Sequence, residues 1–282
     1  MPIDTPEIRR RRSHRFLAWG LVLMFGTMSA AAGSSAESTP SAPRVTGAAA
    51  SPEAPSAHGI HRTFDAVLAD HAQDGRVDYP GIAADPRFER YLGQLARVRP
   101  EDLPSREARL AYWINAYNAF AIKGILDGHS PGTFFGRIGY FKLTEYRAGG
   151  REIDLYDLER KVLIPMGEPR IHFAIVCASS SCPRLPSEAY VPERLEQQLE
   201  RSARHFINDP SRNRFDTEAG VAHLSKIFDW FEEDFAGAAG SVAAYVARYV
   251  ENEKVAQALR EGRLEIRHLR YDWSLNGMPP ES

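Results

Sequence analysis

The chain has 282 residues, of which 43% are apolar and 26% charged, and its formal net charge is −2. This balance excludes a protein that binds nucleic acid through excess basic charge. The length beyond the N-terminal region suits one domain with a real core.

The first 36 residues resemble a secretory leader. Four arginines, Arg9–Arg12, precede an apolar run from Phe16 to about Met28, and small residues follow with candidate cleavage points after Ala32 and Ala36. This order of basic, apolar and small residues is typical of a signal peptide, and the run is short for a membrane span. We expect a cleaved signal peptide, with an uncleaved signal anchor as the alternative. The protein is then exported, most simply to a bacterial periplasm, with secretion as the alternative.

The next segment, residues 37 to about 58, is rich in Ser, Pro, Ala and Gly and predicts a flexible tether. The folded domain is then expected at residues 59–282. Without the first 36 residues the chain carries 30 basic and 35 acidic residues, a net charge of −5. Nucleic acid is therefore not an expected partner.

Apolar periodicity predicts three helices in the first half of the domain, at residues 63–72, 85–98 and about 107–127, with a turn and a short extended piece at residues 74–79. The third helix is apolar on nearly every side, which indicates a buried central helix. It carries Asn115 and Asn118 on one flank. A buried amide without a partner costs about 1–3 kcal/mol, so these side chains either hold neighbouring loop backbone or belong to a site.

The second half mixes helices with short strands. The predicted elements are a long aromatic loop or lid at 133–150, a short helix at 154–163, a central strand at 170–176, a helix at 191–208, a strand at 221–224, helices at 227–235 and 242–250, and a half-buried strand at 263–269. These elements do not alternate as βαβ units. We expect an α+β fold, a mainly helical single domain around a buried central helix with a small sheet.

Several ordered segments together resemble the DUF547 family, a family of unknown function. They are Trp113–Ala119, Arg170–Ser179 with Cys182-Pro183, Leu224–Trp230 with Asp234-Phe235, and Tyr271–Asn276, and the segment Asp74–Tyr79 fits as well. The resemblance covers essentially the whole expected domain. It implies no assigned activity. Plant members resemble this chain around His172 but have Ser-Asp-Pro in place of Ser181-Cys182-Pro183, which argues against a family-wide mechanism that uses a thiol.

The two cysteines, Cys177 and Cys182, flank a Ser-rich loop. In an exported protein the simplest expectation is a disulfide, which over so short a loop stabilises by about 2 kcal/mol. A redox-active pair is less favoured because the spacing is not Cys-x-x-Cys.

A sharper hypothesis makes Cys182 a nucleophile and His172 its base. One of three polar side chains would then orient the imidazole or donate to an oxyanion, namely Asn115, Asn118 or Asp272. Cys177 lies five residues from His172 and would face the other side of an unbroken strand. The order of helix, histidine strand and later acidic residue distantly resembles papain-like and transglutaminase-like folds.

We expect five further side chains to line the same cleft, Asn118, Arg170, Cys177, Ser225 and Lys226. Structural alternatives remain open for the charged ones, because Arg170 could pair with Glu159, and Lys226 with Asp229 or Asp234. Likewise, His172 alone is more often a core histidine than a catalytic base.

Two further interpretations are less favoured. A carbohydrate platform of Trp230, Phe231, Phe235 and Trp273 competes with a core role for these rings. A metal site from His172, Cys177 and Cys182 with His205 or His223 does not match the ligand spacing of a zinc module. We expect no metal and no cofactor.

The sequence thus supports two functional hypotheses. One is a thiol- and His-dependent hydrolase or acyl transferase of the cell envelope. The other is a non-catalytic binding or scaffold module with a structural Cys177–Cys182 disulfide. The partner is expected to be a small molecule, a peptide or an envelope component, and membrane contact is expected only through an uncleaved signal.

Overall fold

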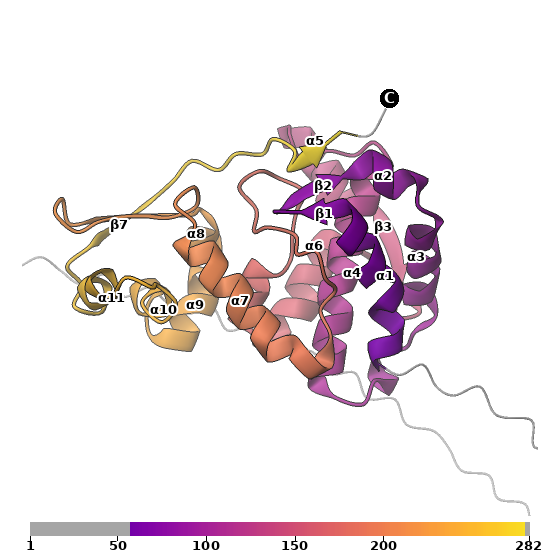
Figure 1. Cartoon of the computed structure of the whole chain (residues 1–282), viewed down its shortest axis with the longest axis horizontal. Helices are drawn as coiled ribbons and strands as arrows, with labels where there is room; N and C mark the ends of the chain where they lie inside the picture. Colours follow the sequence, from indigo (N-terminus) through magenta and orange to yellow (C-terminus); the bar gives the residue numbers. More distant parts are fainter. Residues whose placement is uncertain (1–56, 280–282) are drawn as a thin grey trace, which may run out of the picture. The chain divides into compact units, whose positions relative to one another are not determined.

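A computed structural model describes residues 57–279, so the predicted signal peptide and nearly all of the predicted tether lie outside the described residues. Within them helices predominate and the strands form three small sheets, which confirms a mainly helical α+β domain (Figure 1). None of the described helices is both long and apolar enough to cross a bilayer.

The helices follow the predicted order with shifted ends. The α-helices are α1 (Ala57–His71), α2 (Tyr79–Ala84), α3 (Pro86–Arg97), α4 (Arg106–Leu126), α5 (Phe134–Ile138), α6 (Leu155–Asp157), α7 (Leu195–Asn208), α8 (Ile227–Trp230), α9 (Glu232–Ala239), α10 (Val242–Val246) and α11 (Glu253–Arg260). Short 3₁₀ or π-helical segments, whose turns are tighter or wider than those of an α-helix, are η1 (Pro100–Asp102), η2 (Gly139–Leu143), η3 (Leu158–Leu163), η4 (Ile164–Met166), η5 (Pro169–Phe173) and η6 (Pro192–Arg194). The segments η2 and η3 are π-helical and the others are 3₁₀ turns.

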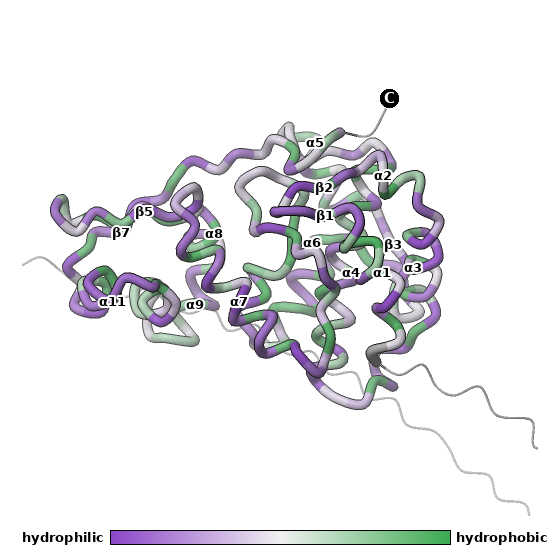
Figure 2. The backbone as a smooth tube through the Cα atoms, in the orientation of Figure 1, coloured by the Kyte–Doolittle hydropathy of each residue, from purple (hydrophilic) through white to green (hydrophobic). Residues whose placement is uncertain are grey.

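The helix α4 is the buried central helix that its composition predicts. Ser105 caps its first turn by accepting a hydrogen bond from the backbone N of Ala108, and nearly all residues from Leu110 to Ile125 are buried. Around it, α1 and α3 pack through Phe64 and Tyr91, whose rings stack with centroids 4.7 Å apart. The outer helices α3 and α11 carry long hydrophilic stretches in Figure 2, as amphipathic surface helices should.

A second apolar cluster gathers around Phe173. Its ring lies 5.1 Å from that of Phe206 on α7 and 5.5 Å from that of Phe235 on α9, measured between centroids. The neighbouring Ile171 and Ala174 belong instead to the cluster around α4. The segment that contains His172 therefore lies between the two apolar clusters.

The strands pair in three sheets. They are β1 (Ala72–Gln73), β2 (Arg76–Asp78) and β8 (Gly277–Met278) in the first, β3 (Glu145–Ala148) and β4 (Arg151–Asp154) in the second, and β5 (Arg214–Asp216), β6 (Val221–Leu224) and β7 (Glu265–His268) in the third. The pairs β2–β8 and β6–β7 are parallel and the others antiparallel. The predicted strands at 221–224 and 263–269 are confirmed as β6 and β7.

Two predicted elements are wrong. Residues 170–176 form no strand, because the 3₁₀ turn η5 occupies most of them and the residues after it have no regular secondary structure. Residues 133–150 are not an irregular loop, because they form α5, the π-helical turn η2 and strand β3. The separate predicted helices at 227–235 and 242–250 are also shorter or broken, into α8 and α9 and into α10.

Candidate functional site

A pocket with mainly aromatic and aliphatic walls lies beside α4 and the Cys177–Cys182 loop, and we call it the aromatic pocket. Its volume is about 330 Å³, within the range of small-molecule sites. Its walls come from α4, α5, η2, the α6–η3 segment, the 172–183 segment, α8 and the 271–273 segment. The lining residues are Tyr117, Phe134, Arg137, Ile138, Phe141, Lys142, Tyr156, Glu159, Arg160, His172, Ile175, Cys177, Cys182, Pro183, Ile227, Trp230, Phe231, Tyr271 and Trp273.

Two tryptophans and a tyrosine form one wall. The ring of Trp273 lies 5.7 Å from that of Trp230 and 4.5 Å from that of Tyr271, between centroids. Trp230 keeps 39% of its surface exposed, which is unusual for so large an apolar side chain. Phe235, in contrast, is fully buried in the core cluster. Of the four rings considered for a platform, three therefore line the pocket.

Three cations lie against the aromatic rings. The guanidinium of Arg137 lies 4.7 Å from the ring of Trp273, and Lys142 Nζ lies 4.0 Å from that of Tyr156. Arg160 lies 4.8 Å from the ring of Phe231. These contacts hold positive charge on the aromatic faces rather than in ion pairs.

His172 is the most enclosed polar residue of the pocket. Its ring stacks on Phe231 with centroids 3.8 Å apart, and its Nε2 lies 2.7 Å from Oδ2 of Asp234. Burial lowers the pKa of His172, although the hydrogen bond to Asp234 opposes this shift. In the neutral ring, the proton on Nε2 is donated to the carboxylate, which leaves Nδ1 as an acceptor. The buried Nδ1 has no hydrogen-bond partner among the described residues.

Glu159 contributes a second titratable group. Burial raises the pKa of its carboxyl to about 7, with Asp234 raising it further and Arg160 opposing. Within residues 57–279 the carboxylate makes no hydrogen bond or ion pair. The predicted Glu159–Arg170 pair does not form, because Arg170 binds Glu168 at 2.8 Å and Glu196 at 2.6 Å.

Cys177 and Cys182 form a disulfide and both line the aromatic pocket. The hydroxyl of Tyr271 lies 3.3 Å from Sγ of Cys177 and 3.2 Å from Sγ of Cys182. Ala178, inside the bridged loop, adopts a left-handed conformation with φ of 61°, which is costly for a residue with a Cβ. The loop is thus held by a covalent bond and by the Tyr271 hydroxyl.

The two asparagines of α4 hold backbone and do not face the pocket. Asn115 donates to the carbonyl O of Tyr190 at 2.7 Å and accepts from its backbone N at 2.9 Å. Asn118 donates to the carbonyl O of Ala174 at 3.0 Å and accepts from the N of Val176 at 2.8 Å. Both side chains are buried and make hydrogen bonds through their oxygen and their nitrogen, as the structural alternative predicts.

The predicted residues do not converge on one cleft, and that expectation needs correction. Only His172, Cys177 and Cys182 line the aromatic pocket. Asp272 is exposed and its Oδ1 accepts from the backbone N of Ser274. Lys226 pairs with Asp229 at 2.6 Å. With Ser225, Lys226 lines a separate pocket.

The sequence assigns other roles to three residues at or beside the aromatic pocket. Glu159 and Tyr271 line the pocket, whereas Asp234 pairs with His172 without lining it. From the sequence, Glu159 is only an ion-pair candidate, Tyr271 only part of a motif, and Asp234 both. The pairing of Asp234 with His172 joins two of the ordered motifs, and that is the signal by which sequence reasoning could have found it. Across the described residues, no group of three His, Cys, Asp or Glu side chains is arranged to hold a metal ion.

The comparison with protein families gives one finding. Residues 100–207 match the family model of DUF547, described as a protein of unknown function, which confirms the resemblance over this stretch. It includes α4, Glu159, His172 and both cysteines. Neither the curated proteins nor the solved structures contain a match.

Proposed function

We propose, with the DUF547 match of residues 100–207 as the premise, that this chain is a non-catalytic binding module whose aromatic pocket holds a small, largely apolar molecule. The observation that carries the proposal is the combination of an aromatic pocket of about 330 Å³ with a disulfide in its wall. A bridged sulfur is no nucleophile until it is reduced. The pocket itself needs no reduction to bind.

The polar atoms of the pocket define the ligand further. His172 Nδ1 is an acceptor without a partner in the described chain, and the Glu159 carboxylate lies on the same pocket. A ligand that donates a hydrogen bond would pair with the Glu159 carboxylate. The preferred ligand therefore has an aromatic or aliphatic ring body and at least one hydroxyl or amine donor.

Export remains part of this proposal. The leader-like pattern of the first 36 residues supports export, and a disulfide suits the oxidising periplasm or exterior. A small molecule of the envelope is the partner that fits both points.

Calorimetric titration with 2-naphthol tests the binding proposal, because this probe combines a ring body with one donor. We expect saturable binding, and about tenfold weaker binding of 2-methoxynaphthalene, which has no donor. Ile138 lines the pocket and Leu143, five residues on, does not. Ile138→Trp should fill the pocket and weaken 2-naphthol binding about tenfold or more.

Leu143→Trp is the matched control, since it also replaces an exposed aliphatic residue of the same segment. It should change the affinity by less than about twofold. Equal effects of the two substitutions, or no saturable binding of the probe, would contradict the proposal.

A second candidate is the thiol- and His-dependent hydrolase or acyl transferase, acting after reduction of the disulfide. It is favoured by one observation, that His172, Cys177 and Cys182 line the same pocket. Under reducing conditions, ester, amide and thioester substrates should then turn over, and both His172→Ala and alkylation of Cys182 should abolish turnover. Activity that survives either change in a folded protein would exclude this candidate.

A further inference from the structure

A second pocket lies at one end of the sheet β5–β6–β7. It measures about 250 Å³, and most of its lining residues carry a positive charge or a hydroxyl group, whereas the lining of the aromatic pocket is mainly aromatic and aliphatic. Four cationic side chains line it, Arg212, Arg214, Lys226 and Arg270, and its lining includes no carboxylate. We call it the cationic pocket.

The sheet topology explains why these residues meet. Strands β6 and β7 are parallel, with Leu224 opposite His268, so the residues that follow both strands lie at the same end of the sheet. Strand β5 is antiparallel to β6, with Arg214 opposite His223, so β5 begins at that end. Three segments distant in sequence are therefore placed together by strand pairing.

Hydrogen bonds fix these segments. The backbone N of Leu269 donates to the carbonyl O of Leu224 at 2.8 Å, which continues the β6–β7 ladder by one residue. Asn213 accepts from the backbone N of Ser225 at 3.0 Å and donates to the carbonyl O of Phe206 at 2.8 Å. The pocket is thus preorganised by its backbone.

The charge of the pocket is poorly balanced by the protein. Lys226 pairs with Asp229, but neither Arg212 nor Arg270 makes a side-chain hydrogen bond or ion pair with any residue between 57 and 279. Arg212 is half-buried, and burial lowers its pKa, since Asp209 and Asp272 offset the lost hydration only in part. A guanidinium withdrawn from water without a partner is unfavourable unless an anion binds it.

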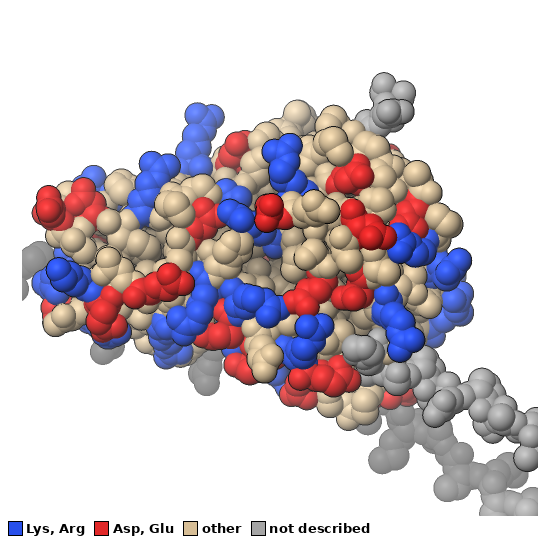
Figure 3. Space-filling model, in the orientation of Figure 1, with Lys and Arg blue, Asp and Glu red and all other residues tan. Residues whose placement is uncertain are grey.

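Neutral donors complete the lining. Ser181, Ser211 and Ser225 each bring a hydroxyl to the pocket wall. Ser211 already donates its proton to Asp209, whereas the hydroxyls of Ser181 and Ser225 accept from backbone N–H groups and can still donate. Guanidinium and hydroxyl donors together match the several oxygens of a tetrahedral oxyanion, and arginine does so with two parallel hydrogen bonds. On the face of the molecule shown in Figure 3, acidic and basic side chains are interspersed.

We propose that the cationic pocket binds a phosphate or sulfate group, free or carried on a small molecule, with Arg212 and Arg270 as its principal ligands. The site is separate from the aromatic pocket and does not depend on the function proposed for it. Only Tyr271 lines both pockets.

Calorimetric titration of the folded chain with inorganic phosphate tests the proposal, with ionic strength held constant by sodium chloride. Saturable binding is expected for phosphate and for sulfate, and binding about tenfold weaker or less is expected for acetate, whose planar carboxylate has fewer oxygens. Glycerol 3-phosphate distinguishes the sources, since tighter binding than that of phosphate indicates a carried group and weaker binding indicates the free ion.

Arg270→Gln should weaken phosphate binding about tenfold or more. Without phosphate it should raise the melting temperature, because it relieves repulsion among like charges, whereas loss of a structural residue would lower it. Arg212→Gln should act in the same direction. If Arg212→Gln does not fold, the phosphate titration of Arg270→Gln alone decides the test, because Arg270 is exposed and its substitution should leave the fold intact.

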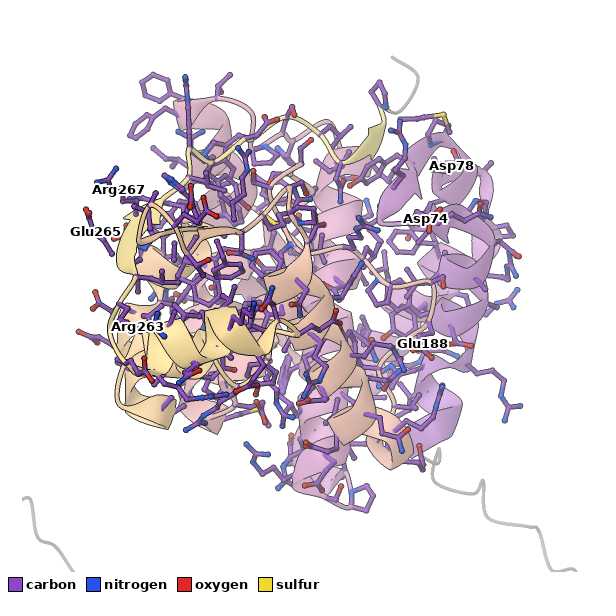
Figure 4. All side chains as sticks on the ribbon, turned by 60° about the vertical axis from the view of Figure 1, so that its left-hand side comes forward. Asp74, Asp78, Glu188, Arg263, Glu265 and Arg267 are labelled. Carbon is purple, nitrogen blue, oxygen red and sulfur yellow. A yellow bond between two sulfur atoms is a disulfide. The ribbon has the colours of Figure 1, made fainter. Side chains whose placement is uncertain are left out.

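Arg267→Gln is the matched control. Arg267 is exposed on β7, pairs with Glu265 at 2.9 Å and lies with it at one edge of the molecule in Figure 4. This variant removes the same charge and should change phosphate affinity by less than about twofold. Absence of saturable binding, or equal weakening by Arg267→Gln and Arg270→Gln, would overturn the proposal. The 2-naphthol titration of Arg270→Gln should match that of the unchanged protein.

Discussion

The side chain of Asn118 makes a hydrogen bond to the backbone of Val176 of the kind that a neighbouring strand would make. Its Oδ1 accepts the backbone N–H of Val176 at 2.8 Å, while its Nδ2 donates to the carbonyl O of Ala174 at 3.0 Å. The segment that leads to Cys177 is therefore attached to α4 by the amide of Asn118. This attachment gives the first prediction.

Asn118→Ala should destabilise the domain by about 2–6 kcal/mol, because two buried backbone groups lose their partners at about 1–3 kcal/mol each. Asn115→Ala removes the equivalent pair of bonds to Tyr190 and should cost as much. Urea denaturation measures both. Only Asn118→Ala should also weaken 2-naphthol binding, since only Asn118 holds the segment that enters the pocket wall. Equal binding by both variants would be inconsistent with this role.

Glu159→Gln should stabilise the protein at neutral and alkaline pH. The folded pKa of about 7 lies above the ordinary value of 4.5, so the folded state binds the proton more tightly. The stability from this proton is complete below the ordinary pKa and is lost as pH rises through 7. The gain from the substitution should therefore grow with pH, up to about 3 kcal/mol.

Glu152→Gln provides the comparison for Glu159. Glu152 is exposed on β4, so its substitution should change the free energy of unfolding by less than about 0.5 kcal/mol at either end of the pH range. Urea denaturation at several pH values measures both variants. A gain for Glu159→Gln that does not rise with pH would exclude a raised pKa.

His172 should produce a pH dependence of opposite sign. Burial lowers its folded pKa below the ordinary 6.5, so the unfolded chain binds more protons as the pH falls. Stability should be lost as the pH drops through 6.5 and continue to fall until the folded pKa is reached. In a Glu159→Gln background, His172→Gln should remove this loss, as measured by the urea midpoint. If the slope persists in the double variant, another group causes it.

The Cys177–Cys182 disulfide should contribute about 2 kcal/mol, as expected for a short loop. The double variant Cys177→Ser, Cys182→Ser removes the bridge without leaving a free thiol, and its unfolding free energy measures the contribution. Alkylation of the unreduced protein, native and denatured, followed by mass measurement should detect no free thiol. A thiol that reacts in the native protein would favour the hydrolase candidate.

Periodicity predicted most helices because their amphipathic faces are buried in a regular pattern. It failed at residues 170–176, where an apolar run resembles a central strand. Pro169 begins a 3₁₀ turn there, and the Asn118 amide then satisfies backbone groups that a strand would present to a neighbour. A short apolar run cannot reveal such a partner 58 residues away.

The sequence predicted only those site residues whose type alone suggests a chemical role. His172 and the cysteines were singled out by residue type, and they do share a pocket. Glu159 could not be recognised, because a carboxylate on a short helix is ordinary until burial is known. Ser225 and Lys226 were noticed in a motif, but their meeting with Arg270 depends on the parallel pairing of β6 and β7.

The pairing of β2 with β8 has a consequence for how the chain acquires its fold. Val77 lies beside Gly277, and a Cβ at Gly277 would come within 2.0 Å of the carbonyl O of Val77, so the two strands meet at close range (Figure 1). During synthesis, β2 leaves the ribosome long before residues 277–278 exist. The first sheet can therefore be completed only after translation has passed them, and contacts between such distant residues form slowly. A chain with this topology therefore completes its fold in a late step, after nearly all of its residues have been synthesised.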